Sequence, residues 1–154
     1  MLGKIQNKRQ AGFTIIEVLI VLAIAGLIML IVFLAIPALQ RNQRNGQRSS
    51  EGSRIVGLIS ECLSNRNGQT SSCDSAAKIG YATSDFGQLT TDPVYWDGTG
   101  FPTLPTTSST VFVFNKKCNA DQSGLDTAAP ASPRQFAVVY QMEGSGTIYR
   151  CLNG

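Results

Sequence analysis

Histidine is absent from the 154-residue chain, which removes the side chain that most often serves as a general base near neutral pH. The sequence also has no glycine-rich phosphate-binding loop, and no two cysteines stand close enough to hold a zinc ion in one short turn. These absences argue against catalysis, a metal site and a bound cofactor. We therefore expect a non-enzymatic protein that acts through its surfaces.

Charged residues are scarce, at 15% of the chain, and none occurs in the nineteen residues from 18 to 36. A helix of that length rises about 28 Å, close to the hydrocarbon thickness of a bilayer. The formal charge of +3 comes from Lys4, Lys8 and Arg9, because the rest of the chain has ten basic and ten acidic residues. The apolar run can therefore span a membrane, and the charge balance does not favour nucleic acid as a partner.

The four cysteines indicate two disulfides formed in an oxidising compartment. Three connectivities are possible. We favour Cys62 with Cys73 and Cys118 with Cys151, because each of these bonds closes a loop across adjacent elements.

An isolated carboxylate, Glu17, stands just ahead of the apolar run. The segment GFTIIEVLIVLAIAGL, residues 12–27, resembles the signal of type IV prepilins, in which a basic leader ends in glycine, phenylalanine opens the mature chain and glutamate is its fifth residue. The resemblance implies that a membrane prepilin peptidase cleaves between Gly12 and Phe13 and methylates the new amine of Phe13. It also implies that Glu17 acts in assembly by meeting the amine of a neighbouring subunit.

Two other interpretations of the N-terminal segment are open. A secretory signal peptide would be cut after Ala23-Ile24-Ala25, but that cut leaves only residues 18–22 as an apolar core. A plain single-pass anchor explains the apolar run and gives no reason for Glu17, whose charge would cost about 2.5 to 3.5 kcal/mol at the centre of a bilayer.

Basic residues are nearly balanced across the apolar run, because three arginines follow it. The pilin resemblance places the leader in the cytoplasm and the cysteines outside. Arg41, Arg44 and Arg48 recur on one helical face. We expect them to form a solvated or headgroup-facing stripe.

The predicted fold class is α+β: a long N-terminal helix, transmembrane in its first half, packs its second half on a small C-terminal antiparallel sheet. Ile55, Ile59 and Cys62 mark an amphipathic continuation of the helix. Gly26 and Pro37 predict a kink or loosening around residues 33–37, and the stretch between them is a candidate for melting in a fibre. The segments are a leader (1–12), a membrane or filament-core helix (13–39), its continuation (40–64) and a head domain (65–154).

Strand patterns occur at residues 111–115, 135–142 and 147–152, and the glycine-containing turn at 143–146 joins the last two as a hairpin. Residues 68–110 are rich in Ser, Thr, Gly and Pro, and we expect an ordered but irregular segment. The connection from 115 to 133 is expected to form a loop closed by Cys118 and Cys151.

The resemblance implies a structural subunit of a type IV pilus, held by one span in the cytoplasmic membrane before assembly and extracellular afterwards. Its implied partners are other pilin subunits in a homo-oligomeric helical filament, prepilin peptidase and the inner-membrane assembly machinery. The alternatives are a minor pilin, a type II secretion pseudopilin and, from another class, a membrane-anchored extracytoplasmic binding module. Adhesion, twitching motility, DNA uptake and secretion are all roles of such fibres.

Overall fold

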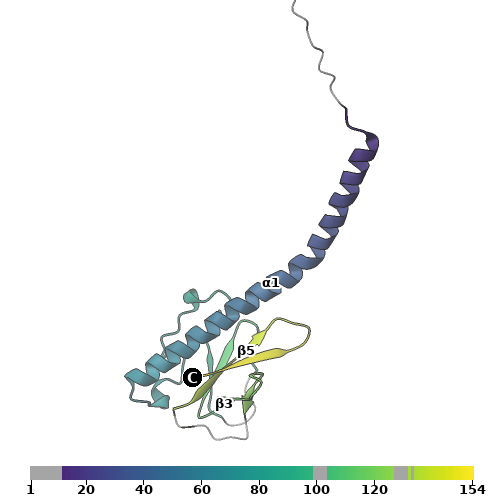
Figure 1. Ribbon diagram of the computed structural model, residues 1–154. Helices are drawn as coiled ribbons and strands as arrows, with labels where there is room; N and C mark the ends of the chain where they lie inside the picture. Colours follow the sequence, from purple (N-terminus) through teal and green to yellow (C-terminus); the bar gives the residue numbers. More distant parts are fainter. Residues whose placement is uncertain (1–11, 99–103, 127–131, 133) are drawn as a thin grey trace, which may run out of the picture. The chain divides into compact units, whose positions relative to one another are not determined.

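The computed structural model describes residues 12–98, 104–126, 132 and 134–154, so the leader up to residue 11 lies outside the described residues. Among these residues, one long helix is followed by two short 3₁₀ turns and six strands. Their bounds are α1 Ile15–Asn65, η1 Thr70–Ser72, η2 Thr83–Asp85, β1 Val94–Trp96, β2 Thr110–Phe114, β3 Lys117–Cys118, β4 Leu125–Asp126, β5 Phe136–Met142 and β6 Ile148–Asn153. Figure 1 labels α1, β3 and β5 among them.

Helix α1 runs through 51 residues without a break, close to the predicted helix of residues 13–64, and it includes Gly26 and Pro37. Two left-handed residues follow its last turn, Asn67 with φ 54° and Gly68 with φ 81°. The Gly68 amide donates to the carbonyl of Leu63 at 2.7 Å, which satisfies one of the carbonyls left open at a helix end. The helix therefore ends at the Asn and Gly signals present in the sequence.

Two compact units divide the chain, an N-terminal unit of residues 1–39 and a head of residues 40–154. Helix α1 contributes to both. In the N-terminal unit, the large apolar side chains are exposed along the whole helix. In the head, the helix buries one face, with Ile55 and Ile59 fully covered.

The head core lies between α1 and the inner face of a four-stranded sheet. Ile55, Ile59 and Leu63 recur at helical spacing and pack on side chains that alternate along the strands. The strands supply Phe112, Phe114, Phe136, Val138 and Tyr140. Each fully buried side chain of this kind contributes roughly 1.5 to 3 kcal/mol relative to exposure.

The sheet order is β1-β2-β5-β6. Strands β2 and β5 pair antiparallel, as do β5 and β6. The sequence predicts the bounds of these three strands within one or two residues. The predicted α+β class with a small, mostly antiparallel sheet is confirmed. Strand β1 is the exception, because it lies in the segment predicted to be irregular and pairs parallel with β2. It has only three residues, too few to show a strand pattern. The Tyr95 ring packs on Phe112 and Phe114 at 5.6 Å between centroids, so tertiary contact stabilises the strand.

The outer face of the sheet carries a second, smaller cluster. Strands β3 and β4 form a short antiparallel hairpin within the connection predicted to be a loop, which is a further correction. Two-residue strands carry no periodicity that a sequence can show. The outer cluster consists of Val113, Cys118, Ala137, Val139 and Cys151, with Trp96, Leu125 and Tyr149 packed against it.

The segment between α1 and β1 is irregular but firmly attached to the helix. The Glu51 carboxylate accepts hydrogen bonds from the backbone amides of Gly87, Gln88 and Leu89 at 2.7 to 3.1 Å. Arg54 donates to the carbonyl of Asp85 at 2.6 Å and lies over the Phe86 ring. The expectation of an ordered, irregular segment holds for its described part outside β1.

Candidate functional site

The start of α1 brings together three residues that the sequence singles out. Gly12 and Phe13 precede the helix, and Phe13 is 89% exposed. A Cβ added at Gly12 would meet no atom within 4 Å in the described part of the chain. The peptide bond between Gly12 and Phe13 therefore lies in open surroundings, one residue before the N-cap.

Glu17 forms a capping box with Thr14. One carboxylate oxygen, Oε2, accepts from the Thr14 amide at 2.9 Å and from the Thr14 hydroxyl at 2.7 Å, while the Glu17 amide reaches the Thr14 hydroxyl oxygen at 3.4 Å. This is the reciprocal arrangement that a Thr-x-x-Glu sequence makes at a helix N-terminus. Thr14 is a site residue that our sequence analysis misses, although its spacing from Glu17 was the signal.

Capping leaves half of the Glu17 carboxylate unused. Both hydrogen bonds from Thr14 end on Oε2, and no hydrogen bond or ion pair within the described residues ends on Oε1. A shallow groove along the helix is lined by Glu17 together with Phe13, Val18, Val21 and Leu22. Glu17 thus places one open acceptor oxygen on an otherwise apolar helix surface.

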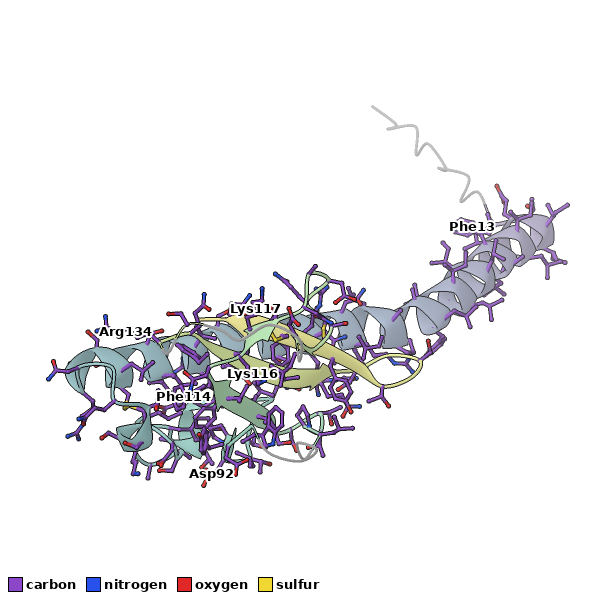
Figure 2. All side chains as sticks on the ribbon, turned by 90° about the horizontal axis from the view of Figure 1, so that it is seen from below. Phe13, Asp92, Phe114, Lys116, Lys117 and Arg134 are labelled. Atoms are coloured by element: carbon purple, nitrogen blue, oxygen red, sulfur yellow. A yellow bond between two sulfur atoms is a disulfide. The ribbon has the colours of Figure 1, made fainter. Side chains whose placement is uncertain are left out.

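The N-terminal part of α1 exposes apolar side chains in every direction (Figure 2). Consecutive residues of a helix point about 100° apart, and the five residues 18–22 are each about half exposed or more. By length and composition this helix can cross a membrane. Such a surface has to be covered by lipid or by other chains, because water disfavours it.

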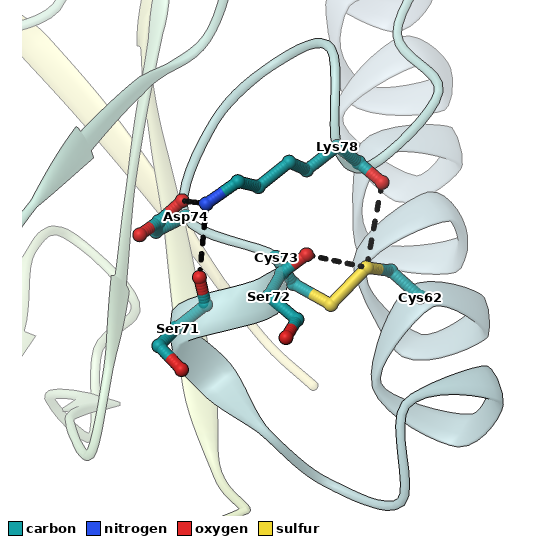
Figure 3. The surroundings of a disulfide bond; sticks show 6 residues. All are labelled: Cys62, Ser71, Ser72, Cys73, Asp74 and Lys78. Atoms are coloured by element: carbon teal, nitrogen blue, oxygen red, sulfur yellow. Dashed lines mark hydrogen bonds and ion pairs between the residues drawn. A yellow bond between two sulfur atoms is a disulfide. The ribbon is translucent and has the colours of Figure 1, made fainter.

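Both disulfides join the cysteines that the sequence analysis pairs. Cys62, near the end of α1, is bonded to Cys73 just after η1, with 6.0 Å between their Cα atoms (Figure 3). Beside them, the Lys78 ammonium contacts the Asp74 carboxylate at 2.6 Å and the Ser71 carbonyl at 3.0 Å. Cys118 is bonded to Cys151, with 5.6 Å between Cα atoms, and ties β3 to β6.

The arginine stripe is not solvated as expected. The Arg44 guanidinium binds the Glu143 carboxylate in a forked contact at 2.6 to 2.9 Å, and Arg48, only 4% exposed, binds it at 2.7 Å. The side-chain amide of Asn45 exchanges two hydrogen bonds of 2.8 Å with the Glu143 backbone. The prediction was wrong for Arg44 and Arg48 because their partner lies almost a hundred residues away, in the β5–β6 turn.

The Glu143 cluster is an electrostatic attachment between the head part of α1 and the sheet. Hydrogen bonds from Arg44, then from Arg48, lower the pKa of Glu143 to about 2. The same carboxylate raises the pKa of Arg44 above its ordinary value. Arg41 remains exposed, as predicted. The cluster is structural, since its one carboxylate is bound by two arginines of the same head.

Comparison with known proteins identifies only the N-terminal segment. Residues 7–33 match the family model described as the prokaryotic N-terminal methylation motif, which is typical of type IV pilins and pseudopilins. No curated protein and no solved structure matches the chain. The matched residues include Gly12, Phe13 and Glu17, so the site built above coincides with that motif.

Proposed function

We propose that this protein is a structural subunit of a type IV pilus or a related filament, assembled through its N-terminal helix. The observation that carries the proposal is a methylation motif placed on a helix with apolar side chains exposed all round. Lipid covers such a helix before assembly. In a filament, the parallel helices of further copies replace the lipid, and the heads face outward.

Processing precedes assembly in this proposal. Prepilin peptidase removes the leader after Gly12 and methylates the amine of Phe13, so the mature chain begins one residue before Thr14. The open surroundings of this bond support access by the peptidase. The processed subunit stays in the cytoplasmic membrane until the assembly machinery moves it into an extracellular fibre.

Glu17 sets the register between subunits through its open oxygen. The methylated amine of a neighbouring Phe13 is a cation, and Oε1 of Glu17 is free to accept it while Oε2 keeps the helix capped. Opposite charges about 4 Å apart attract by about 4 kcal/mol at an effective dielectric constant of 20, before desolvation is subtracted. The capping box holds the carboxylate in place for this contact.

One observation favours a second candidate function. Because Glu17 caps its own helix, its presence has a local explanation that a plain membrane anchor shares. On this alternative the chain is a membrane-anchored extracytoplasmic binding module, and the carboxylate meets no neighbouring amine. A minor pilin or a type II secretion pseudopilin would instead use Glu17 as the major pilin does.

Replacing Glu17 by Gln separates the capping role from the charged role. Glutamine keeps the reciprocal cap but cannot pair with a cation, whereas Thr14→Val weakens the cap and keeps the charge. We expect Glu17→Gln to be processed and retained in membranes, yet to fall roughly tenfold or more in sheared fibres, as a loss of at least 1.4 kcal/mol implies. Thr14→Val should enter fibres nearly as the unchanged chain does.

The measurement is the amount of subunit in the sheared fibre fraction relative to the membrane fraction, in cells where this protein is the sole candidate for the major subunit. Normal incorporation of Glu17→Gln would refute the charge-pairing register. Cells that carry the protein in membranes but show no fibres containing it would favour the anchored module.

A further inference from the structure

A polar groove on the head lies between α1 and the edge of the sheet, where the yellow strand β6 runs in Figure 1. It has a volume of about 460 Å³, within the range of small-molecule sites. The helix side carries Asn42, Gly46 and Ser49, and the strand side carries Tyr140 and Arg150. None of its lining residues is acidic.

A row of polar side chains crosses the inner face of the sheet beneath this groove. Thr110 of β2 pairs with Tyr140 of β5, which pairs with Arg150 of β6. Directly opposed residues bring their Cβ atoms within about 4.5 to 5.5 Å. The three side chains therefore lead from the core outward to the groove.

The Tyr140 hydroxyl opens at the wall of the groove and has no hydrogen-bond partner among the described residues. The ring is enclosed by the head, since the residue as a whole is 1% exposed. The neighbouring Thr110 hydroxyl is buried without a partner in the described part of the chain. A phenol that opens into a groove without a protein partner can both donate to and accept from a ligand there.

Arg150 supplies the charge. Arg150 is exposed and forms no ion pair among the described residues. In this it differs from Arg44 and Arg48 of α1, which both bind Glu143. Asn42 and Ser49 add an amide and a hydroxyl that make no side-chain hydrogen bond in the described structure. The groove thus offers one unneutralised guanidinium and several neutral groups that both donate and accept.

We propose that this groove binds an acidic sugar, with the sugar carboxylate on Arg150 and its hydroxyl groups on Tyr140, Asn42 and Ser49. A single guanidinium matches a single carboxylate. Hydroxyl groups donate and accept, as do the groove's phenol, amide and hydroxyl. Gly46 leaves room for the ring, because a Cβ added there meets no described atom within 4 Å. This binding is independent of filament assembly.

The test is calorimetric titration of the full chain in detergent with sodium glucuronate, with glucose and sodium acetate as comparison ligands. We expect saturable binding of glucuronate and much weaker binding of the other two. Arg150→Gln should lower the affinity roughly tenfold or more, since it removes a charge-assisted contact. Tyr140→Phe should lower it roughly threefold while leaving the fold intact, because the hydroxyl has no internal partner.

Two further variants control the result. Arg66→Gln makes the same change of charge at an exposed arginine beyond the end of α1 and should bind like the unchanged chain. Gly46→Leu fills the groove from the helix side and should abolish binding, with the fold checked by circular dichroism. Three outcomes would overturn the proposal: no saturable binding of glucuronate, acetate bound as tightly as glucuronate, or equal affinities for Arg150→Gln and Arg66→Gln.

Discussion

Glu17 and Glu143 show at the residue scale how differently one side-chain type is used in this chain. Both oxygens of Glu143 accept hydrogen bonds from guanidinium groups of the same head. Glu17 uses one oxygen within its own first helical turn and keeps the other open. The satisfied carboxylate holds the fold together, and the half-satisfied one has capacity for a partner outside the chain.

Protonation of Glu143 is expected to destabilise the head in acid. Arg44 and Arg48 lower its pKa to about 2, below the value of about 4.3 for an unfolded glutamate. A lowered pKa gives stability that is complete above the unfolded value and is lost as the pH falls through the folded value. Urea unfolding of the full chain in detergent should therefore show a falling midpoint between about pH 4.5 and pH 2.

Glu143→Gln should unfold at lower urea at neutral pH and lose this part of the pH dependence. Glu61→Gln is the matched control, because Glu61 is exposed and has no ion pair in the described residues. Equal pH profiles for the unchanged chain and Glu143→Gln would show that the arginine contacts contribute nothing.

The mature chain is expected to begin at Phe13 with a methylated amine. Gly12 presents no side chain at the cut, and Phe13 is 89% exposed. Mass analysis of the N-terminal peptide from sheared fibres measures this directly. A chain beginning at Met1, or at Gly26 after the Ala-Ile-Ala site, would contradict it.

At the scale of elements, Gly52 sets how closely α1 approaches the sheet. A Cβ at this position would lie 2.8 Å from Cε1 of Tyr140. At Gly57, on the same helix, an added Cβ meets no described atom within 4 Å. The two glycines therefore differ in tertiary contact while sharing the low helix propensity of the residue.

Alanine substitution should separate the two. We expect Gly52→Ala to lower the free energy of unfolding by about 1 kcal/mol, because overpacking of roughly 1 to 3 kcal/mol exceeds the gain in propensity. Gly57→Ala should raise it by about 0.5 to 1 kcal/mol. Thermal unfolding in the same detergent measures both. If Gly52→Ala proves as stabilising as Gly57→Ala, the close approach to Tyr140 is not limiting.

Elements with their own periodicity could be predicted from the sequence, and those made by distant contacts could not. Helix α1 and strands β2, β5 and β6 carry clear patterns of apolar residues. Strand β1 is held by aromatic rings of β2, and the Glu143 cluster joins residues almost a hundred positions apart. The capping box at Thr14 could have been predicted, since its signal, a threonine three residues before a glutamate, is local. The strand pattern predicts Tyr140 as a core residue, and only the structure shows that its hydroxyl has no hydrogen-bond partner among the described residues.

At the scale of the whole molecule, the two units of the chain differ in whether their apolar side chains are exposed to water or buried. The N-terminal unit exposes its apolar side chains, whereas the head encloses both of its apolar clusters. Every residue of those clusters lies after residue 39, so the head does not draw on the N-terminal unit for its core.

A fragment of residues 40–154 is therefore expected to fold and to remain soluble without detergent. Both disulfides should form in it, and closing loops with separations of 11 and 33 residues contributes about 3 and 4 kcal/mol respectively by loop entropy. Peptide mapping without reduction and thermal unfolding with and without reductant measure these effects. Free thiols at Cys118 and Cys151, or aggregation of the oxidised fragment, would contradict the expectation.

The disulfides join consecutive cysteines, the first with the second and the third with the fourth. If the head crosses the membrane in sequence order behind the membrane span, Cys62 and Cys73 emerge before Cys118, so each cysteine meets its native partner before a wrong one. Oxidation in order of emergence then gives the final pattern directly, and thiol exchange has no mispaired bond to correct. On the proposed export, we expect the head to mature with an oxidase and without a disulfide isomerase.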